Sequence, residues 1–146
     1  MLTSETMTLG EALDSLDDQI DTLDERLADL DSDTDDATAV RDHRNRLQYL
    51  RQGVEWQVDE WGDDTEVEVG ALTAGEEAMM HREIPDDAGE EERRLWYVAA
   101  ATESAPYVAG ELAETFAAVA DLHPAFAGWV EARSNALGVA GNRSTT

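Results

Sequence analysis

The sequence has no cysteine, no lysine and no long run of apolar residues. Without cysteine there can be no disulfide, no thiolate metal site and no thiol nucleophile. A membrane-spanning helix needs about 20 predominantly apolar residues, so we expect no membrane span. The N-terminus lacks the charged and then apolar pattern of a secretory signal. A length of 146 residues suits one domain, or an elongated arm with one small domain.

Positive charge is also scarce. All 10 basic residues are arginine, against 34 acidic residues, which gives a formal net charge of -24. Such a chain repels itself in dilute buffer, whereas at about 1 M salt the Debye length falls to roughly 3 Å and screens the repulsion. We therefore interpret it as a cytoplasmic protein of a halophilic archaeal host, or of a virus of such a host, in which case it is a candidate virion component. Binding to nucleic acid requires clustered positive charge, so we expect no nucleic-acid partner.

The strongest local pattern is a pair of heptad seams. A capping box, Thr8–Glu11, begins the first seam, and an aspartate-rich turn at 31–36 separates it from a second seam over about 37–61. Two helices of similar length joined by a short turn predict an antiparallel, coiled-coil-like hairpin over 8–62. Four arginines between 41 and 51 would neutralise the aspartates of the first helix. The seam residues are Leu9, Leu13, Leu16, Ile20, Leu23, Leu27 and Leu30, followed by Val40, His43, Leu47, Leu50, Val54, Gln57 and Trp61.

Residues 63–138 predict a small helical domain. Alternation over 65–69 indicates one short strand, whose partner the sequence does not reveal. A second capping box, Thr73–Glu76, begins a helix that ends near residue 83, and further helices are expected over about 90–103, from Pro106, and from Pro124 to Gly138. Residues 1–7 and 139–146 are predicted to be flexible ends. The expected fold is therefore mainly α, with a helical hairpin followed by a small helical bundle that contains one short strand.

No catalytic or metal-binding pattern emerges. His43, His81 and His123 lie far apart and match neither a zinc-protease motif nor a nucleophile elbow. His43 falls on the hairpin seam, and His123 precedes a proline as a helix-start residue does. The aspartate run at 31–36 lacks the turn glycine of a calcium loop. We predict no enzyme activity, no cofactor and no bound metal.

The large aromatic residues are candidate anchors for a partner protein, because tryptophan and tyrosine are favoured at interfaces. Trp56 points away from the seam, whereas Trp61 lies on it. Trp96 and Tyr97 are adjacent, so they cannot both face the same core. The alternative is that these residues pack between the hairpin and the bundle. The candidate partner-binding residues are Trp56, Trp61, Trp96, Tyr97 and Trp129.

Three short segments of the second half carry a family resemblance. A helix-opening L-T-x-G-E segment is followed by an R-R-L-x-x-V-A-A-A helix and by an L-x-P helix that contains Trp129. From Glu66 to Leu137 the chain resembles the tail assembly chaperones of tailed viruses, here of haloarchaeal type. The matching residues are Leu72, Thr73, Gly75 and Glu76; Arg94, Leu95, Val98, Ala99 and Ala100; and Leu122, Pro124, Trp129 and Val130.

The resemblance implies a protein without catalytic activity that binds the long helical tape-measure protein and keeps it soluble until tail-tube subunits polymerise around it. Its partners would be tape-measure, tail or neck subunits, and copies of itself in a homo-oligomer. Two alternatives stay open: a viral neck or connector component, which would form a ring, and a cellular haloarchaeal coiled-coil adaptor, which would use the 9–30 seam. If residues 40–61 of the same chain cover that seam, the interface lies elsewhere.

Overall fold

The computed structural model describes residues 1–144. The fold class is confirmed as mainly helical with an N-terminal hairpin, and the sheet has three strands where one was expected. None of the helices within residues 1–144 is long and apolar enough to cross a membrane. The elements are β1 (Thr3–Thr8), α1 (Leu9–Ala28), α2 (Asp35–Trp61), β2 (Glu66–Ala71), α3 (Ala74–Glu83), α4 (Glu90–Ala101), β3 (Thr102–Ser104), α5 (Leu112–Val119) and α6 (Pro124–Ser144).

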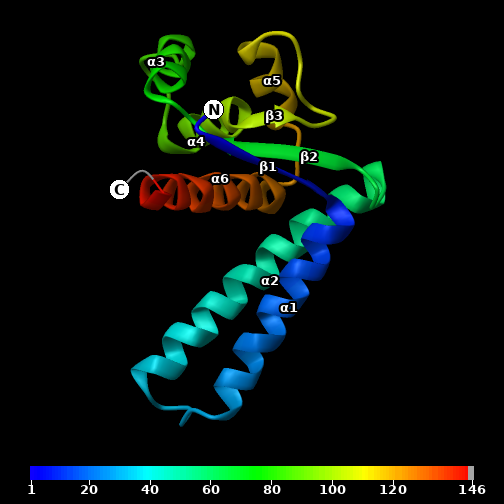
Figure 1. Cartoon of the computed structure of the whole chain (residues 1–146), viewed down its shortest axis with the longest axis vertical. Coiled ribbons are helices and arrows are strands. Elements are labelled where there is room, and N and C mark those ends of the chain that lie inside the picture. Colours follow the sequence, from blue (N-terminus) through cyan, green and yellow to red (C-terminus); the bar gives the residue numbers. More distant parts are fainter. Residues whose placement is uncertain (145–146) are drawn as a thin grey trace.

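α1 and α2 form an antiparallel arm that projects from a head made of all the other elements (Figure 1). Buried seam residues fill the space between the two helices, among them Leu16, Ile20 and Leu47. Residues 40–61 of the same chain therefore cover most of the 9–30 seam, although Leu13 and Leu23 stay partly exposed and Leu30 lies beyond the end of α1. On one side of the arm, Arg44 forms an ion pair with Asp24. Seven residues further along α2, Arg51 forms an ion pair with Asp17. Two of the four clustered arginines thus neutralise aspartates of α1 as expected.

In the sequence, the arm connects two strands that pair with each other in the sheet. β1 pairs antiparallel with β2, with Thr8 opposite Glu66 at the end nearest the arm, and β2 pairs antiparallel with β3. The backbone N–H of Leu9 donates to the carbonyl of Thr65 over 2.9 Å and fastens the base of the arm. The arm therefore occupies the place of a hairpin loop.

Several boundaries correct the expectations from sequence. Residues 1–7, expected to be a flexible start, contain most of β1, because pairing with β2 makes a strand of a segment without apolar alternation. The helix expected from Pro106 begins only at Leu112. α6 continues beyond Gly138 to Ser144, so the expected tail is helical in its described part; the expectation for 145–146 falls outside the described residues.

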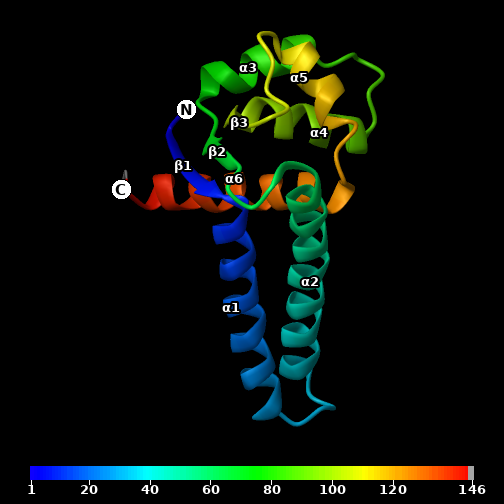
Figure 2. The same cartoon turned by 90° about the vertical axis from the view of Figure 1, so that its right-hand side faces the viewer.

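α6 lies under the sheet and across the base of the arm (Figures 1 and 2). It meets α2 at Gly53, where an added Cβ would lie 2.2 Å from the backbone nitrogen of Phe126. The main core gathers around this crossing and includes fully buried side chains from the arm, the sheet and α6: Leu9, Val54, Val67, Phe126 and Val130. The crossing of α2 and α6 is therefore the joint between arm and head.

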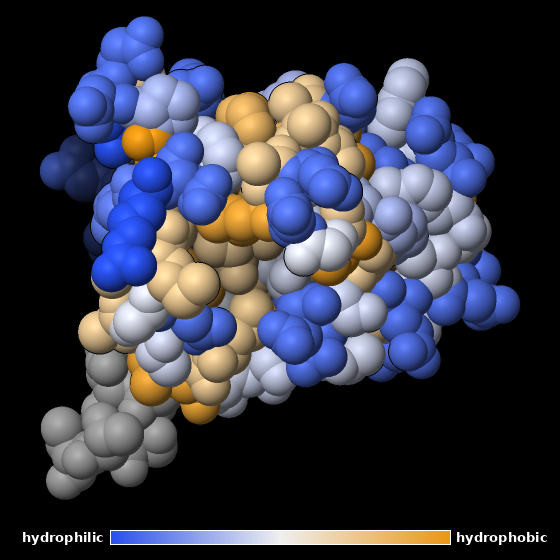
Figure 3. Space-filling model, turned by 90° about the horizontal axis from the view of Figure 1, so that it is seen from above, coloured by the Kyte–Doolittle hydropathy of each residue, from blue (hydrophilic) through white to orange (hydrophobic). Residues whose placement is uncertain are grey.

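A second, smaller core lies between α3, α4 and α5. Trp96 stacks on Phe116, with ring centroids 4.2 Å apart and an interplanar angle of 9°. Met80 and Ile84 of the α3 region close the other side. From above, apolar residues extend from the middle of the head to one edge, with hydrophilic residues on the other sides (Figure 3).

Candidate protein-interaction surfaces

The four tryptophans occupy different environments. Trp96 and Trp129 are buried, with 5% and 3% of their surface exposed, which corrects the expectation that they face a partner. Trp61 is partly buried and meets Phe126 edge-on, with centroids 5.6 Å apart. Trp56 is 55% exposed. Of the four, Trp56 alone presents most of its surface to solvent.

Trp56 lies beside the start of α6. Its ring centroid is 5.6 Å from that of His123. His123 is a helix-start residue as expected, because its Nδ1 accepts a hydrogen bond from the N–H of Ala125. The buried seam residue Gln57 supports this arrangement, since its side-chain oxygen accepts the N–H of His123 over 3.1 Å.

Tyr49 lies seven residues before Trp56, so both project from the same face of α2. Tyr49 is 41% exposed, and the guanidinium of Arg46 stands 5.5 Å from its ring centroid, within the range of a cation–π contact. We call Tyr49, Trp56, His123 and Pro124 the aromatic face. Tyr49 was not among the predicted anchors, although its spacing of seven residues from Trp56 places the two on one face.

A groove of about 140 Å³ opens next to the aromatic face. Arg94 lines it and pairs with Glu91 at 3.2 Å and with Glu131 at 3.6 Å. The groove therefore has apolar residues and two opposite pairs of charges in its lining, and protein interfaces combine an apolar centre with a polar rim in this way. Its lining comprises Arg46, Tyr49, Glu91, Arg94, Leu95, Val98, Pro124, Ala127, Gly128 and Glu131.

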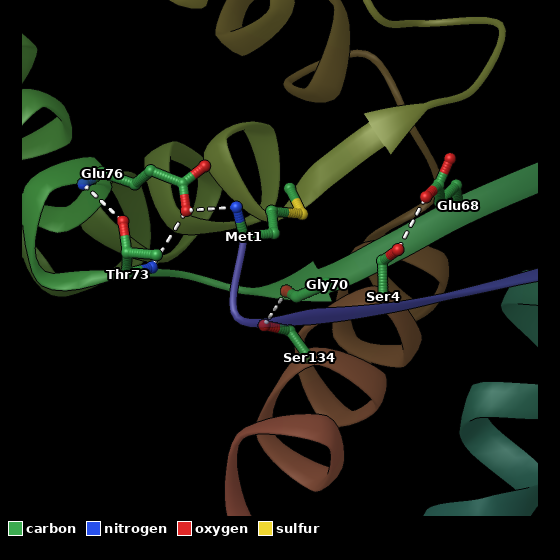
Figure 4. Close-up of polar contacts among 7 residues, drawn as sticks. All are labelled: Met1, Ser4, Glu68, Gly70, Thr73, Glu76 and Ser134. Carbon is green, nitrogen blue, oxygen red and sulfur yellow. Dashed lines mark hydrogen bonds and ion pairs between the residues drawn. The ribbon is translucent and has the colours of Figure 1, made fainter. Parts of the chain in front are cut away.

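Tyr97, another predicted anchor, ties elements of the head together. Its hydroxyl shares a hydrogen bond of 2.6 Å with that of the buried Ser134, and the Ser134 hydroxyl donates to the carbonyl of Gly70 over 2.8 Å (Figure 4). These contacts connect α4, α6 and β2. Tyr97 is half-buried, and its polar end has a structural role.

The start of β1 is tied to α3 by a charged network (Figure 4). The amino group of Met1 lies 2.9 Å from a carboxylate oxygen of Glu76. The same carboxylate accepts the backbone N–H of Thr73 and so completes the predicted capping box. The hydrogen bond from Thr73, with the Met1 amine as a smaller contribution, holds the pKa of Glu76 below its ordinary value.

The arm has two chemically different flanks. On one flank of α1, Asp14, Asp17, Asp21 and Asp24 follow at steps of three and four residues, and two of them pair with arginines of α2. The other flank of α1 is less charged, since uncharged residues and one arginine follow at the same helical spacing with Asp18 beside them. We call this second surface the neutral flank, which consists of Ser15, Gln19, Thr22 and Arg26 of α1 with His43 of α2.

A shallow groove of about 270 Å³ runs along the neutral flank. Its floor is apolar and comes from Leu23 and Leu47, while Gln19, Thr22 and His43 border it together with the carboxylate of Asp18. This groove exists because two helices alone cannot enclose both sides of their seam. The seam residue His43 is exposed here and lies on the border of the groove.

Two further features describe the chemistry of the molecule. Burial raises the pKa of the Tyr107 hydroxyl, which hydrogen-bonds to that of Thr102 over 2.7 Å inside the core. Within residues 1–144, no group of three or more carboxylate or histidine side chains comes together as metal ligands would.

Comparison with known proteins finds no matching family model, no matching curated protein and no matching solved structure.

Proposed function

We propose that this chain is a non-catalytic assembly protein of a halophilic system that binds a helical partner protein through its aromatic face. The resemblance over residues 66–137 favours the tape-measure protein of a tailed virus as the partner, and this chain would be its chaperone. The observation that carries the proposal is the exposure of Trp56, at 55%, in a chain that buries Trp96 and Trp129.

The energetics favour an interface at this position. An aromatic side chain buries about 150–250 Å² when it is fully enclosed, and each Å² is worth roughly 25 cal/mol. Covering the exposed half of the Trp56 indole therefore contributes on the order of 2–3 kcal/mol. The neighbouring Tyr49 adds apolar area, and the groove beside it could accept a side chain of the partner.

Two other features support the proposal. The second helix covers most of the 9–30 seam, and the aromatic face offers exposed anchors outside it. The high negative charge keeps a complex with an apolar client soluble.

The test is affinity capture from native lysate at molar salt, with mass spectrometry of the bound proteins. Wild type is compared with Trp56→Ser and with the matched control Met79→Ser, which removes a 65% exposed apolar side chain from α3. We expect wild type and control to recover a long helical tail protein, and Trp56→Ser to lose at least ten-fold of it.

Equal recovery by Trp56→Ser, with its circular dichroism unchanged, would refute the role of the aromatic face. Recovery of host proteins alone would favour a cellular adaptor. Recovery of a ring of this chain with neck subunits would favour a connector component.

A further inference from the structure

We propose that α3 is a lid, which opens as a unit while the rest of the fold stays intact and thereby uncovers the apolar side chains around Trp96. This goes beyond the proposed function, because α3 contributes nothing to the aromatic face and either can fail without the other. Three features of the head support the lid: the few contacts that hold α3, the chemistry of the surface beneath it, and the firm anchoring of its neighbours.

α3 has few contacts with the rest of the chain. Of its ten residues only Met80 is buried, whereas the neighbouring Met79 is 65% exposed. Ile84, which directly follows the helix, is buried beside Met80. Among the side chains that the structure describes, one ion pair joins α3 to the rest of the head, between Glu76 and the amino group of Met1. An isolated helix of this length is marginal in water, so α3 depends on these contacts for its order.

The surface beneath α3 is apolar and contains one unsatisfied polar group. Met80 and Ile84 pack in the second core with Leu72 and Trp96, and Phe116 stacks on the Trp96 indole. The indole N–H of Trp96 is buried and donates to no acceptor among the residues that the structure describes. A buried donor without an acceptor destabilises the state that buries it. Opening of α3 would let water reach this N–H, which offsets part of the cost of exposing the apolar side chains.

The elements on both sides of α3 are anchored independently of it. β2 places Val67 and Val69 in the main core, and α4 places Val98 there. Pro85 ends the segment of α3, and the connection to α4 over residues 85–89 is exposed except for the partly buried Ala88. Segments that open locally are those with few buried apolar contacts. α3 can therefore leave its place without disturbing either neighbour.

The first experiment is hydrogen exchange of the full wild-type chain in 2 M KCl, followed by NMR at increasing urea concentrations below the unfolding transition. Exchange through a local opening depends little on urea, because little surface becomes exposed, whereas exchange through global unfolding depends on urea steeply. We expect the backbone N–H of Met80 and the indole N–H of Trp96 to exchange through one local opening. Relative to its intrinsic rate, each should exchange at least 100-fold faster than the backbone N–H of Val98 in α4.

The second experiment uses the absence of cysteine from the chain. Met80→Cys places a single thiol beneath α3, and Val98→Cys places one in α4 as the matched control, since both positions are buried. The reaction of each thiol with an aromatic disulfide reagent is followed in 2 M KCl without urea. We expect the thiol at position 80 to react at least 100-fold faster than the thiol at position 98.

The lid is refuted if the N–H of Met80 exchanges with the urea dependence of global unfolding, or if it exchanges locally while the indole N–H of Trp96 stays as protected as α4. Equal thiol reactivity at positions 80 and 98 would contradict it as well. The exchange measurement needs no variant, so a loosening of α3 by Met80→Cys cannot produce the result. Trp56→Ser should change the exchange rates less than two-fold, which separates the lid from the aromatic face.

Discussion

Replacing Gly53 with alanine tests the crossing of α2 and α6 that joins the arm to the head. The new Cβ would lie 2.2 Å from the nitrogen of Phe126, 2.4 Å from the carbonyl carbon of Ala125 and 2.7 Å from its Cβ. These atoms belong to a helix backbone or are fixed to it, so none can rotate away. Because carbon contacts are normally about 3.5–4.0 Å, the two helices must separate by more than 1 Å.

The magnitude follows from two opposing effects. Overpacking a filled core costs about 1–3 kcal/mol, and the upper end applies here because the obstacle is backbone. Alanine in place of glycine stabilises the helix by about 1 kcal/mol through its higher helix propensity. The net expectation is a loss of about 2 kcal/mol in the free energy of unfolding, or about 8 °C in Tm at roughly 4 °C per kcal/mol.

The assay is urea unfolding at constant 2 M KCl, followed by circular dichroism at 222 nm. Gly75→Ala is the matched control, because it is the same substitution within a helix and its Cβ meets nothing nearer than the Thr73 hydroxyl at 4.0 Å. We expect the control to be neutral or more stable than wild type. If Gly53→Ala unfolds at the same urea concentration as the control, the close crossing described here is wrong.

Two further predictions concern the arm and the head. Leu16 is 4% exposed within the arm, and its replacement by alanine should lower the free energy of unfolding by about 3 kcal/mol, measured by the same urea assay. A loss below about 1 kcal/mol would contradict the packing of α1 on α2. The pKa of Glu76 is depressed below 4.5 in the folded chain, so its carboxylate stabilises the fold above about that pH and the benefit is lost as the pH falls through the lower, folded pKa. The difference in Tm between wild type and Glu76→Gln should therefore shrink as the pH is lowered below 4.5, and a constant difference would contradict this account.

Local patterns in the sequence predicted local structure well. Both capping boxes, Thr8–Glu11 and Thr73–Glu76, are present with both of their hydrogen bonds, because each depends on residues within one helical turn. β1 was missed because Met7 is its single apolar residue, so the segment shows no apolar alternation, and because its pairing partner lies far away in the chain. Gly138 suggested a helix end, yet it faces Ala71 of β2 and lies within α6.

The candidate surfaces were predictable only in part. Spacing alone placed Trp56 off the seam, and it is exposed. For Trp96 and Tyr97 the sequence could not decide which faces a core, because α4 is covered by α3 and α5 on one side and by α6 on another. The helical spacing of the neutral-flank residues on α1 is visible in the sequence. Its position beside an apolar groove follows only from the way in which α2 packs against α1.

The insertion of the arm between β1 and β2 has a consequence for folding kinetics. The two strands are remote in sequence, so bringing their ends together in an open chain carries a large loop-closure entropy. Formation of the arm from its tip toward its base removes that cost, because it delivers Thr8 and Glu66 to the same place. Sheet formation should therefore follow arm formation, and the chain folds faster than the separation of its strands suggests. Whole heptads could be added to or removed from the arm without changing the register of β1 on β2.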